Sequence, residues 1–362
     1  MALSLEHIER TVSGEKHIID ANLTLESGTF NVLLGHTLSG KTSLMRLVAG
    51  LDAPSRGRVL LNGRDMTGVS VRQRNVSMVY QQFINYPTLT VFDNIASPLK
   101  LAKVPKQEIR RRVEEIAGML RIEHLLGRYP QELSGGQQQR TAMARALVKE
   151  ADLVLFDEPL VNLDYKLREE LRLEMRKLFH ARNTIAVYAT TEPGEALALG
   201  DTTTLIHEGR ILQSGPSDHV YHHPETVEAA SLFGEPPINL MDVELRNSEL
   251  IIDRSTFAIP PPLAQLKPGR YRLGVRPSHL GLNRKREDDL SFRMVVGVAE
   301  ISGSETFLHV SSDAFDLVLH LSGIHEFQVD DEVRVHAPSH KLFIFDKHGD
   351  LVHAPGQIQK QA

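Results

Sequence analysis

The stretch GHTLSGKT, at residues 35–42, follows the pattern GxxxxGK[ST]. The residues before it, TFNVLL at 29–34, are apolar and β-branched and predict a strand. The residues after it, LMRLVA at 44–49, predict a helix that Gly50 ends. A glycine-containing loop between a strand and a helix is the setting in which this motif binds nucleotide phosphates. The sequence therefore predicts an α/β domain built around a phosphate-binding loop.

The residue types of this loop explain its predicted chemistry. Glycine lets successive backbone N–H groups curl around phosphate oxygens, and the helix N-terminus adds a partial positive charge. Lys41 should reach the β- and γ-phosphates of ATP, and the Thr42 hydroxyl should ligate Mg²⁺. The predicted fold is that of an α/β P-loop NTPase. The residues expected to contact the nucleotide through this loop are Gly35, His36, Thr37, Leu38, Ser39, Gly40, Lys41, Thr42 and Ser43.

A second chemical motif is LVLFDEP, at residues 153–159. Its continuous apolar run suits a parallel strand that is buried on both faces. At the end of the strand, Asp157 is placed to hold Mg²⁺, and Glu158 to orient or deprotonate the attacking water. The alternative is a pair of solvated acids at a strand end. The phosphate loop favours the catalytic interpretation because it gives both carboxylates a role.

Composition narrows the classes of function. The 362 residues allow two or three domains, and a formal charge of −5 gives no support for nucleic-acid binding. The absence of cysteine excludes disulfides, thiol catalysis and cysteine-ligated metals. The N-terminus lacks the features of a secretory signal, and no apolar run approaches the ~20 residues of a membrane helix. We therefore expect a cytoplasmic protein that reaches a membrane only through a partner.

Between the two motifs lies LSGGQ, at residues 133–137, followed by a helical stretch. At this point the sequence resembles the ATP-binding-cassette (ABC) ATPases, whose signature is LSGGQ. The resemblance implies a head-to-tail dimer in which the signature of one subunit binds the γ-phosphate held by the other. A serine and consecutive glycine N–H groups at a helix N-terminus form a suitable anion nest. The implied contacts are Ser134, Gly135, Gly136 and Gln137.

Other segments agree with this family. Gln81 ends a predicted strand at VYQ and resembles the glutamine of the family's glutamine loop, which would contact Mg²⁺ and the attacking water. NLD, at residues 162–164, resembles the loop that crosses the dimer interface. The resemblance covers residues 1–235, with a helical subdomain at about 86–150.

The segment 236–362 has a different pattern, with short alternating strands that predict a small all-β barrel or sandwich. GVRPSHLGL, ISGSET and HKLFIFD resemble the C-terminal domain of sugar-importer ATPases of the maltose type, which is built from oligonucleotide-binding-like (OB-like) barrels. Such a barrel does not by itself imply binding of nucleic acid. A passive dimerisation module and a regulatory domain both remain open.

Three positions depart from the family pattern. At the end of the predicted strand before Thr191, the family typically reads VTHD, with a histidine switch that bonds the γ-phosphate. Here residues 189–192 read ATTE, so Thr191 occupies the switch position. A threonine hydroxyl is shorter and uncharged, although it could also simply cap the helix that begins near Glu195. The usual adenine-stacking aromatic residue is missing, which leaves Val12 as an apolar contact. Val161 replaces the usual serine of the interface loop.

These departures predict one half of a heterodimer whose own site is weakened, since a homodimer would carry the same defects twice. Several longer segments, VYATTEPGEAL among them, resemble one ATPase subunit of bacterial glycerol importers. The resemblance implies a second ATPase, two membrane permease subunits and, indirectly, a periplasmic solute-binding protein. The alternatives are a partner subunit that binds ATP without useful turnover and, less favoured, an ABC ATPase of nucleic-acid repair or translation.

Overall fold

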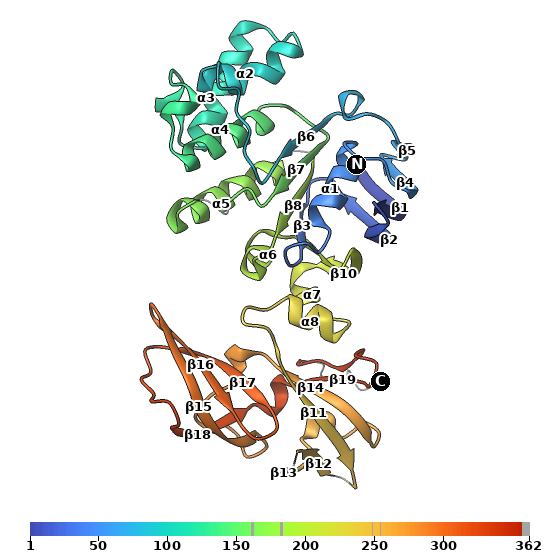
Figure 1. Cartoon of the computed structure of the whole chain (residues 1–362), viewed down its shortest axis with the longest axis vertical. Coiled ribbons are helices and arrows are strands. Elements are labelled where there is room, and N and C mark those ends of the chain that lie inside the picture. Colours follow the sequence, from blue (N-terminus) through green and yellow to red (C-terminus); the bar gives the residue numbers. More distant parts are fainter. Residues whose placement is uncertain (161–162, 182–183, 248, 254, 357–362) are drawn as a thin grey trace. The chain divides into compact units, whose positions relative to one another are not determined.

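The computed structural model describes the whole chain except residues 161–162, 182–183, 248, 254 and 357–362. The described residues form two compact units, an N-terminal unit, Met1–Ser217, and a C-terminal unit, Asp218–Ala362 (Figure 1). Each is described by itself.

The boundary between the units differs from the division predicted after residue 235. The short helix α8 (Val227–Leu232) belongs to the C-terminal unit because Val227 and Ala230 pack with Phe343 and Phe345. The sequence of this helix gives no sign of these distant partners.

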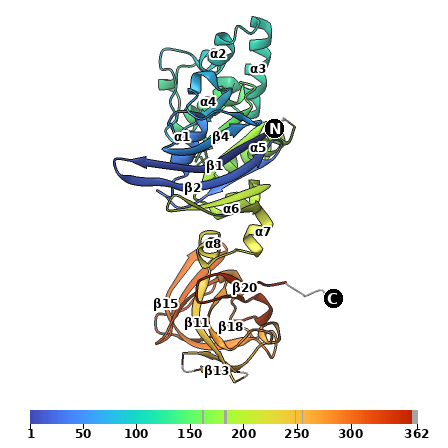
Figure 2. The same ribbon diagram turned by 90° about the vertical axis from the view of Figure 1, so that its right-hand side faces the viewer.

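The N-terminal unit contains a six-stranded sheet in the order β10-β9-β3-β8-β7-β6. All neighbouring pairs in it are parallel except β9 with β10, which form an antiparallel hairpin. A second, four-stranded sheet has the order β2-β1-β4-β5, and its long β1–β2 hairpin is plain in Figure 2. The strands of this unit are β1 (Ala2–Val12), β2 (Glu15–Glu26), β3 (Phe30–Leu34), β4 (Arg56–Leu61), β5 (Arg64–Asp65), β6 (Val76–Val79), β7 (Leu153–Asp157), β8 (Ile185–Thr190), β9 (Thr202–His207) and β10 (Arg210–Pro216).

Helices cover both faces of the parallel sheet, as its continuous apolar strands require. The α-helices of the N-terminal unit are α1 (Lys41–Ala49), α2 (Val91–Leu101), α3 (Lys106–Met119), α4 (Gly135–Leu147), α5 (Tyr165–Ala181) and α6 (Pro193–Leu199). Three single-turn 3₁₀ helices accompany them, η1 (Val71–Gln73), η2 (Glu123–Leu125) and η3 (Pro130–Glu132). Helices α2, α3 and α4 occupy the segment for which the sequence predicted a helical subdomain.

The central strands alternate between two cores because successive side chains point to opposite faces of a sheet. On one face, Leu155 of β7 and Val187 of β8 join the cluster that includes Leu44 of α1. On the other face, Phe156 and Tyr188 are fully buried together with Phe30 of β3 and Phe179 of α5. The Phe179 ring stands edge-on to Phe30 and to Phe156, with a centroid separation of 5.7 Å in each case. These aromatic contacts fix α5 to the sheet.

The C-terminal unit is built on two antiparallel sheets, ordered β13-β12-β11-β14-β19-β20 and β17-β16-β15-β18. Its strands are β11 (Asn239–Arg246), β12 (Glu249–Ile252), β13 (Ser255–Ala258), β14 (Gly269–Val275), β15 (Leu290–Ser302), β16 (Glu305–Ser311), β17 (Asp316–Ser322), β18 (Glu332–Ala337), β19 (Phe343–Phe345) and β20 (Leu351–His353). Besides α8 it has α7 (Ser217–His222) and the 3₁₀ helices η4 (Pro261–Leu263), η5 (Pro277–His279) and η6 (Ser339–Lys341). The predicted all-β character of residues 236–362 is confirmed, since the α-helices of this unit precede residue 236.

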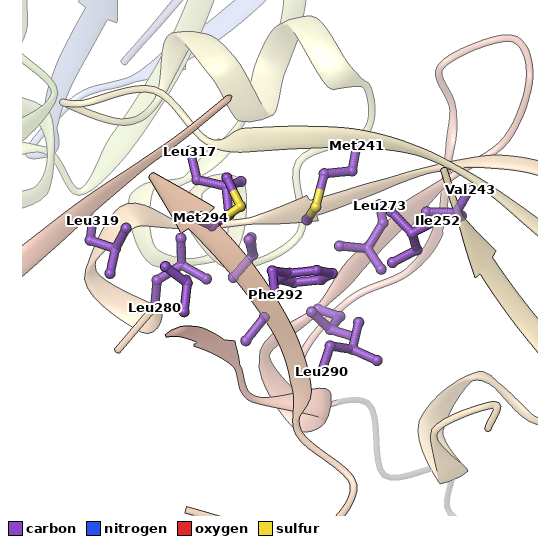
Figure 3. Packing of buried hydrophobic residues seen from close by; sticks show 14 of the residues in the cluster. Met241, Val243, Ile252, Leu273, Leu280, Leu290, Phe292, Met294, Leu317 and Leu319 are labelled. Carbon is purple, nitrogen blue, oxygen red and sulfur yellow. The ribbon is translucent and has the colours of Figure 1, made fainter. Parts of the chain in front are cut away.

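The two sheets of the C-terminal unit share one hydrophobic core. Met241 and Leu273 from the first sheet pack in one cluster with Phe292, Met294 and Leu317 from the second (Figure 3). Along β15 the buried residues are every second one from Leu290 to Val296, the period expected for a strand with one face on a core. This unit therefore has an apolar core of its own.

No helix in the described part of the chain is long and apolar enough to span a membrane.

The aromatic cluster beneath α5 gives a stability prediction. Phe179→Ala should lower the free energy of unfolding by about 3–5 kcal/mol, because it removes a buried ring from a close-packed site. Leu173→Ala on the same helix is the matched control, since Leu173 is 62% exposed, and it should change stability by no more than about 0.5 kcal/mol. Chemical denaturation of the two variants measures both effects. Equal losses would contradict the assigned role of Phe179.

Candidate nucleotide-binding site

The phosphate loop joins β3 to α1 and is confined by neighbouring backbone. A Cβ atom added at Gly35 would lie 2.4 Å from the carbonyl oxygen of Ile206, so no side chain fits there. Gly40 has φ = 108°, a conformation that favours glycine. The loop is held in shape by the Ser39 carbonyl, which accepts from the Gly209 N–H at 2.8 Å. Geometry therefore requires both glycines of the motif. The phosphate loop has its curled shape without a bound nucleotide.

Lys41 begins α1, and its side chain is folded into the loop. Its ammonium group donates to the carbonyl oxygens of Gly35, at 2.7 Å, and His36, at 3.0 Å, and lies 3.6 Å from a carboxylate oxygen of Glu158. Burial lowers the pKa of Lys41, an effect that the nearby Glu158 partly offsets. A buried cation in a curled loop is suited to phosphate oxygens. The buried Ser39 hydroxyl has no hydrogen-bond partner among the described residues and is a further polar group in the loop.

Thr42 and Asp157 meet across the site. The Thr42 hydroxyl donates to a carboxylate oxygen of Asp157 at 2.8 Å. Burial raises the pKa of Asp157, and the hydrogen bond from Thr42 opposes that shift. A hydroxyl and one carboxylate, completed by nucleotide phosphates, form a donor set that suits Mg²⁺. Within the described residues, no three His, Asp or Glu side chains form a metal site by themselves.

Glu158 follows Asp157 and is shared by two neighbours. Its second carboxylate oxygen accepts from the Gln81 side-chain amide at 3.0 Å. Its backbone lies in the left-handed region, with φ = 48°, and its N–H donates to the Ala189 carbonyl at 3.1 Å. The structure thus brings Lys41, Gln81 and Glu158 together, as expected if they act on one phosphate group.

Thr191 directly follows β8, whose neighbours are β3 and β7 (Figure 1). The Thr190 carbonyl accepts from the Gly35 N–H at 3.3 Å, which joins the end of β8 to the phosphate loop. The capping interpretation of Thr191 is wrong, because α6 begins at Pro193 with Glu192 as its N-cap residue. The hydroxyl that accepts from the Glu192 N–H, at 3.0 Å, is that of Thr190.

The signature segment lies at the N-terminus of α4. The Ser134 hydroxyl accepts from the Gln137 N–H, and the Gln137 side chain accepts from the Ser134 N–H, which is a capping box. In the described part of the chain, no hydrogen bond or ion pair joins Ser134, Gly135, Gly136 or Gln137 to the phosphate loop. In these contacts, the signature segment is therefore not joined to the phosphate loop of its own chain.

Two of the predicted departures receive less support from the structure. Val12 ends β1 and is 37% exposed, so it offers an apolar surface but no ring. Val161 lies outside the described residues.

Sequence reasoning missed a group of ionic residues next to this site. Arg168 of α5 donates to both carboxylate oxygens of Glu192, at 2.8 and 3.1 Å. The buried Arg172, one turn further along α5, donates to Glu195 at 2.6 Å. The spacing of four between the arginines was a signal that both lie on one face of a helix. Only the fold shows that this face meets Glu192 and Glu195.

Comparison with known proteins agrees with this geometry. The profile of the family described as "ABC transporter" matches residues 18–161. A sn-glycerol-3-phosphate import ATP-binding protein, UgpC of Rhizobium meliloti (strain 1021), is 36% identical over 96% of this chain and 98% of its own length. The chain belongs to the ABC transporter family. An uncharacterized ABC transporter ATP-binding protein, YurJ of Bacillus subtilis (strain 168), is 34% identical over 95% of this chain and 97% of the relative.

Solved structures support the same assignment. The dimeric structure of MJ0796, a bacterial ABC transporter cassette, has a TM-score of 0.56 and 26% identity, and the match covers 59% of this chain and 98% of the cassette. A post-hydrolysis state of that cassette bound to ADP and P_i matches with a TM-score of 0.55. The predicted fold and the resemblance to importer ATPases are confirmed. This ABC protein is an ATP-binding subunit of the importer type and an ATPase.

The buried carboxylate of Asp157 gives a pH-dependent prediction. Asp157→Asn should raise the melting temperature of the nucleotide-free protein at pH 7, because it removes a charge that burial disfavours. The raised pKa means that the folded state binds the proton more readily than the unfolded state, so the cost of the charge is present above the folded pKa. It disappears below the unfolded value of about 4, and the gain in melting temperature should vanish there.

Thermal unfolding between about pH 3 and 8 measures this effect. Asp313→Asn, at an exposed position of the C-terminal unit, is the control and should leave the melting temperature unchanged. A pH-independent gain, or a loss of stability at pH 7, would contradict the role of burial. ATP turnover of Asp157→Asn should fall in spite of the higher stability.

Proposed function

We propose that this subunit couples ATP binding and hydrolysis to uptake of glycerol, or of another polyol or sugar, and pairs with a second, different ATPase. The observation that carries the heterodimer is Thr191, which follows β8 beside the phosphate loop at the position where the family has histidine. The solute is inherited from resemblance, and UgpC, named for sn-glycerol-3-phosphate, adds the phosphate ester to the candidates.

The arrangement of side chains supports hydrolysis at this subunit's own site. Glu158 is placed to accept a proton from, or orient, a water that attacks the γ-phosphate, and Gln81 holds its carboxylate at 3.0 Å. Lys41 would exchange its bonds to two loop carbonyls for bonds to phosphate oxygens. Thr42, Gln81 and Asp157 would hold Mg²⁺, which when bound neutralises charge on the phosphates.

The weak point of the site is Thr191. A hydroxyl cannot supply the positive charge or the reach of an imidazole, so its contact with the γ-phosphate would need a bridging water or movement of the loop. A non-hydrolysing partner subunit is therefore the second candidate function. It is favoured by Thr191 and by the exposed Val12, and opposed by the intact set of Lys41, Gln81 and Glu158.

The proposed membrane partners need a docking surface on the N-terminal unit. A groove of about 530 Å³ lies between β6, α2 and α4 and is lined by Met78, Tyr86, Leu101 and Arg145, among others. Leu101 is 87% exposed, and Arg145 stacks on the Tyr86 ring at 4.8 Å. An apolar groove with an aromatic wall fits a short amphipathic helix of a permease subunit. Such docking would hold the chain at the cytoplasmic face of the inner membrane, with no role for nucleic acid.

Substitutions at two site residues test how ATP hydrolysis is divided between the two ATPases of the assembled transporter. Glu158→Gln should lower ATP turnover by about 100-fold or more, since it removes the candidate base. Thr191→His should raise turnover, by up to about 100-fold, if the switch position limits this site. The same glutamate-to-glutamine change in the partner ATPase is the comparison. If only the partner's change abolishes turnover, this subunit binds ATP and lends its signature segment.

A charge in the groove tests the docking surface. Leu101→Glu should weaken assembly with the permease and abolish coupled transport, because it places a carboxylate on an apolar contact. ATP binding by the isolated subunit should be unchanged. Leu173→Glu, on α5 and 62% exposed, is the control and should leave assembly intact. Co-purification of the complex measures both, and normal assembly of Leu101→Glu would contradict the proposed surface.

A further inference from the structure

One guanidinium group joins two loops of the N-terminal unit that are far apart in the sequence. Arg168 lies in the first turn of α5. Its Nη2 donates to the carbonyl oxygen of Leu163, at 3.4 Å, in the loop before the helix. Its Nη1 donates to both carboxylate oxygens of Glu192, at 2.8 and 3.1 Å, and Glu192 directly follows Thr191. The Arg168 side chain is thus a bridge between the Leu163 loop and the Thr191 loop.

The shape of the guanidinium group fixes the orientation of this bridge. A guanidinium is planar, and its donors point in fixed directions, so two acceptors on different segments hold it in one orientation. Arg168 is 20% exposed and Glu192 37% exposed, so water competes only partly with these contacts. An ammonium group would keep the charge but could not reproduce the fork. Movement of either loop therefore breaks a contact or moves the other loop.

The two residues that flank Thr191 are hydrogen-bonded to each other. Its predecessor, Thr190, accepts from the Glu192 N–H at 3.0 Å, and the Glu192 carboxylate also accepts from Arg172 at 3.3 Å. The backbone on either side of Thr191 is therefore linked to Glu192, and through Glu192 to α5.

Arg172 has a different, structural role. It is 10% exposed and pairs with Glu195, which is 5% exposed and accepts from the Tyr188 hydroxyl at 3.0 Å. This buried pair fixes the base of α6 to α5. Among the described contacts of Arg172, none reaches the Leu163 loop. Arg168 alone of the two makes the bridge.

We propose that Arg168 is a positioning residue that couples the Leu163 loop to the Thr191 loop through Glu192. The inference rests on the proposed function, in which Leu163 and Asp164 belong to the loop at the dimer interface and Thr191 occupies the switch position. Closure of a second ATPase against the Leu163 loop would then re-aim Thr191 at the nucleotide. This coupling would supply the loop movement that the short, uncharged Thr191 side chain needs to contact the γ-phosphate.

Hydrogen exchange of the full-length chain tests the coupling without nucleotide or partner. The Asp164 carboxylate accepts from the Leu167 N–H at 3.0 Å and caps α5, so Asp164→Ala should loosen the Leu163 loop. In the wild-type background, we expect Asp164→Ala also to speed amide exchange in peptides that cover Thr191 and Glu192. In the Arg168→Lys and Arg168→Ala backgrounds, the same change should have no effect on those peptides.

Arg176 supplies the matched control. It lies two turns further along α5 and donates to Asp201 and to the Ala198 carbonyl, but contacts neither Leu163 nor Glu192. In the Arg176→Ala background, transmission from Asp164→Ala to the Thr191 peptides should persist. Transmission that survives in the Arg168 variants, or that is absent from the wild type, overturns the proposal.

Turnover in the assembled transporter supplies the functional readout. Arg168→Lys should lower kcat about tenfold, because a small misplacement of a group at the reacting centre is costly, and leave KM for ATP unchanged. Arg176→Ala should alter neither. If Glu158→Gln leaves turnover intact, hydrolysis at this site fails as a proposal while the exchange result still decides the coupling. If exchange shows no coupling, the role of Arg168 fails whatever the turnover of Glu158→Gln.

Discussion

The parallel pairing of β3, β8 and β7 is the constraint on which the site depends. In parallel strands the carboxyl ends lie at one edge of the sheet, so the phosphate loop, Thr191 and the pair Asp157–Glu158 converge there. Two backbone hydrogen bonds set the level of that edge, from Gly35 to Thr190 and from Glu158 to Ala189. The aromatic contacts of Phe179 hold the sheet against α5, and α5 carries Arg168. The strands that pack against α5 are therefore the same strands that position the residues of the site.

The nucleotide-free site holds charges that would be more stable in water. Burial lowers the pKa of Lys41 and raises that of Asp157, which means that both groups carry a cost in their charged forms. Lys41 offsets part of its cost with two loop carbonyls and with Glu158, and Asp157 with Thr42. A polyphosphate with a divalent cation supplies the missing partners for both. Nucleotide binding should therefore offset the cost of these buried charges and stabilise the protein.

Much of the fold could be predicted from the sequence because its signals are local. The continuous apolar run at 153–156 lies in β7, and the loop motif stands between β3 and α1 as expected. In the C-terminal unit, the stretch VELRNSELIID, at residues 243–253, contributes to two strands, β11 and β12. The chain reverses at Asn247, which has φ = 50°. Asparagine tolerates that conformation better than most residues, so the turn had a signal in the sequence.

The contacts around the site were harder to predict because they join segments distant in sequence. Lys41, Thr42, Asp157 and Glu158 could be found from their motifs, but the bonds that bring them together depend on strand order. Arg168 and Glu192 had no motif at all. Their meeting depends on how α5 crosses the end of β8, and that is decided by the buried rings beneath the helix.

The C-terminal unit has its own core, in which one sheet supplies Met241 and Leu273 and the other Phe292 and Met294. A unit that buries its own apolar surface does not need the ATP-binding unit to fold. In evolutionary terms, such a segment can be exchanged by recombination between genes while the nucleotide chemistry is inherited unchanged. The two units of one polypeptide can then evolve at different rates.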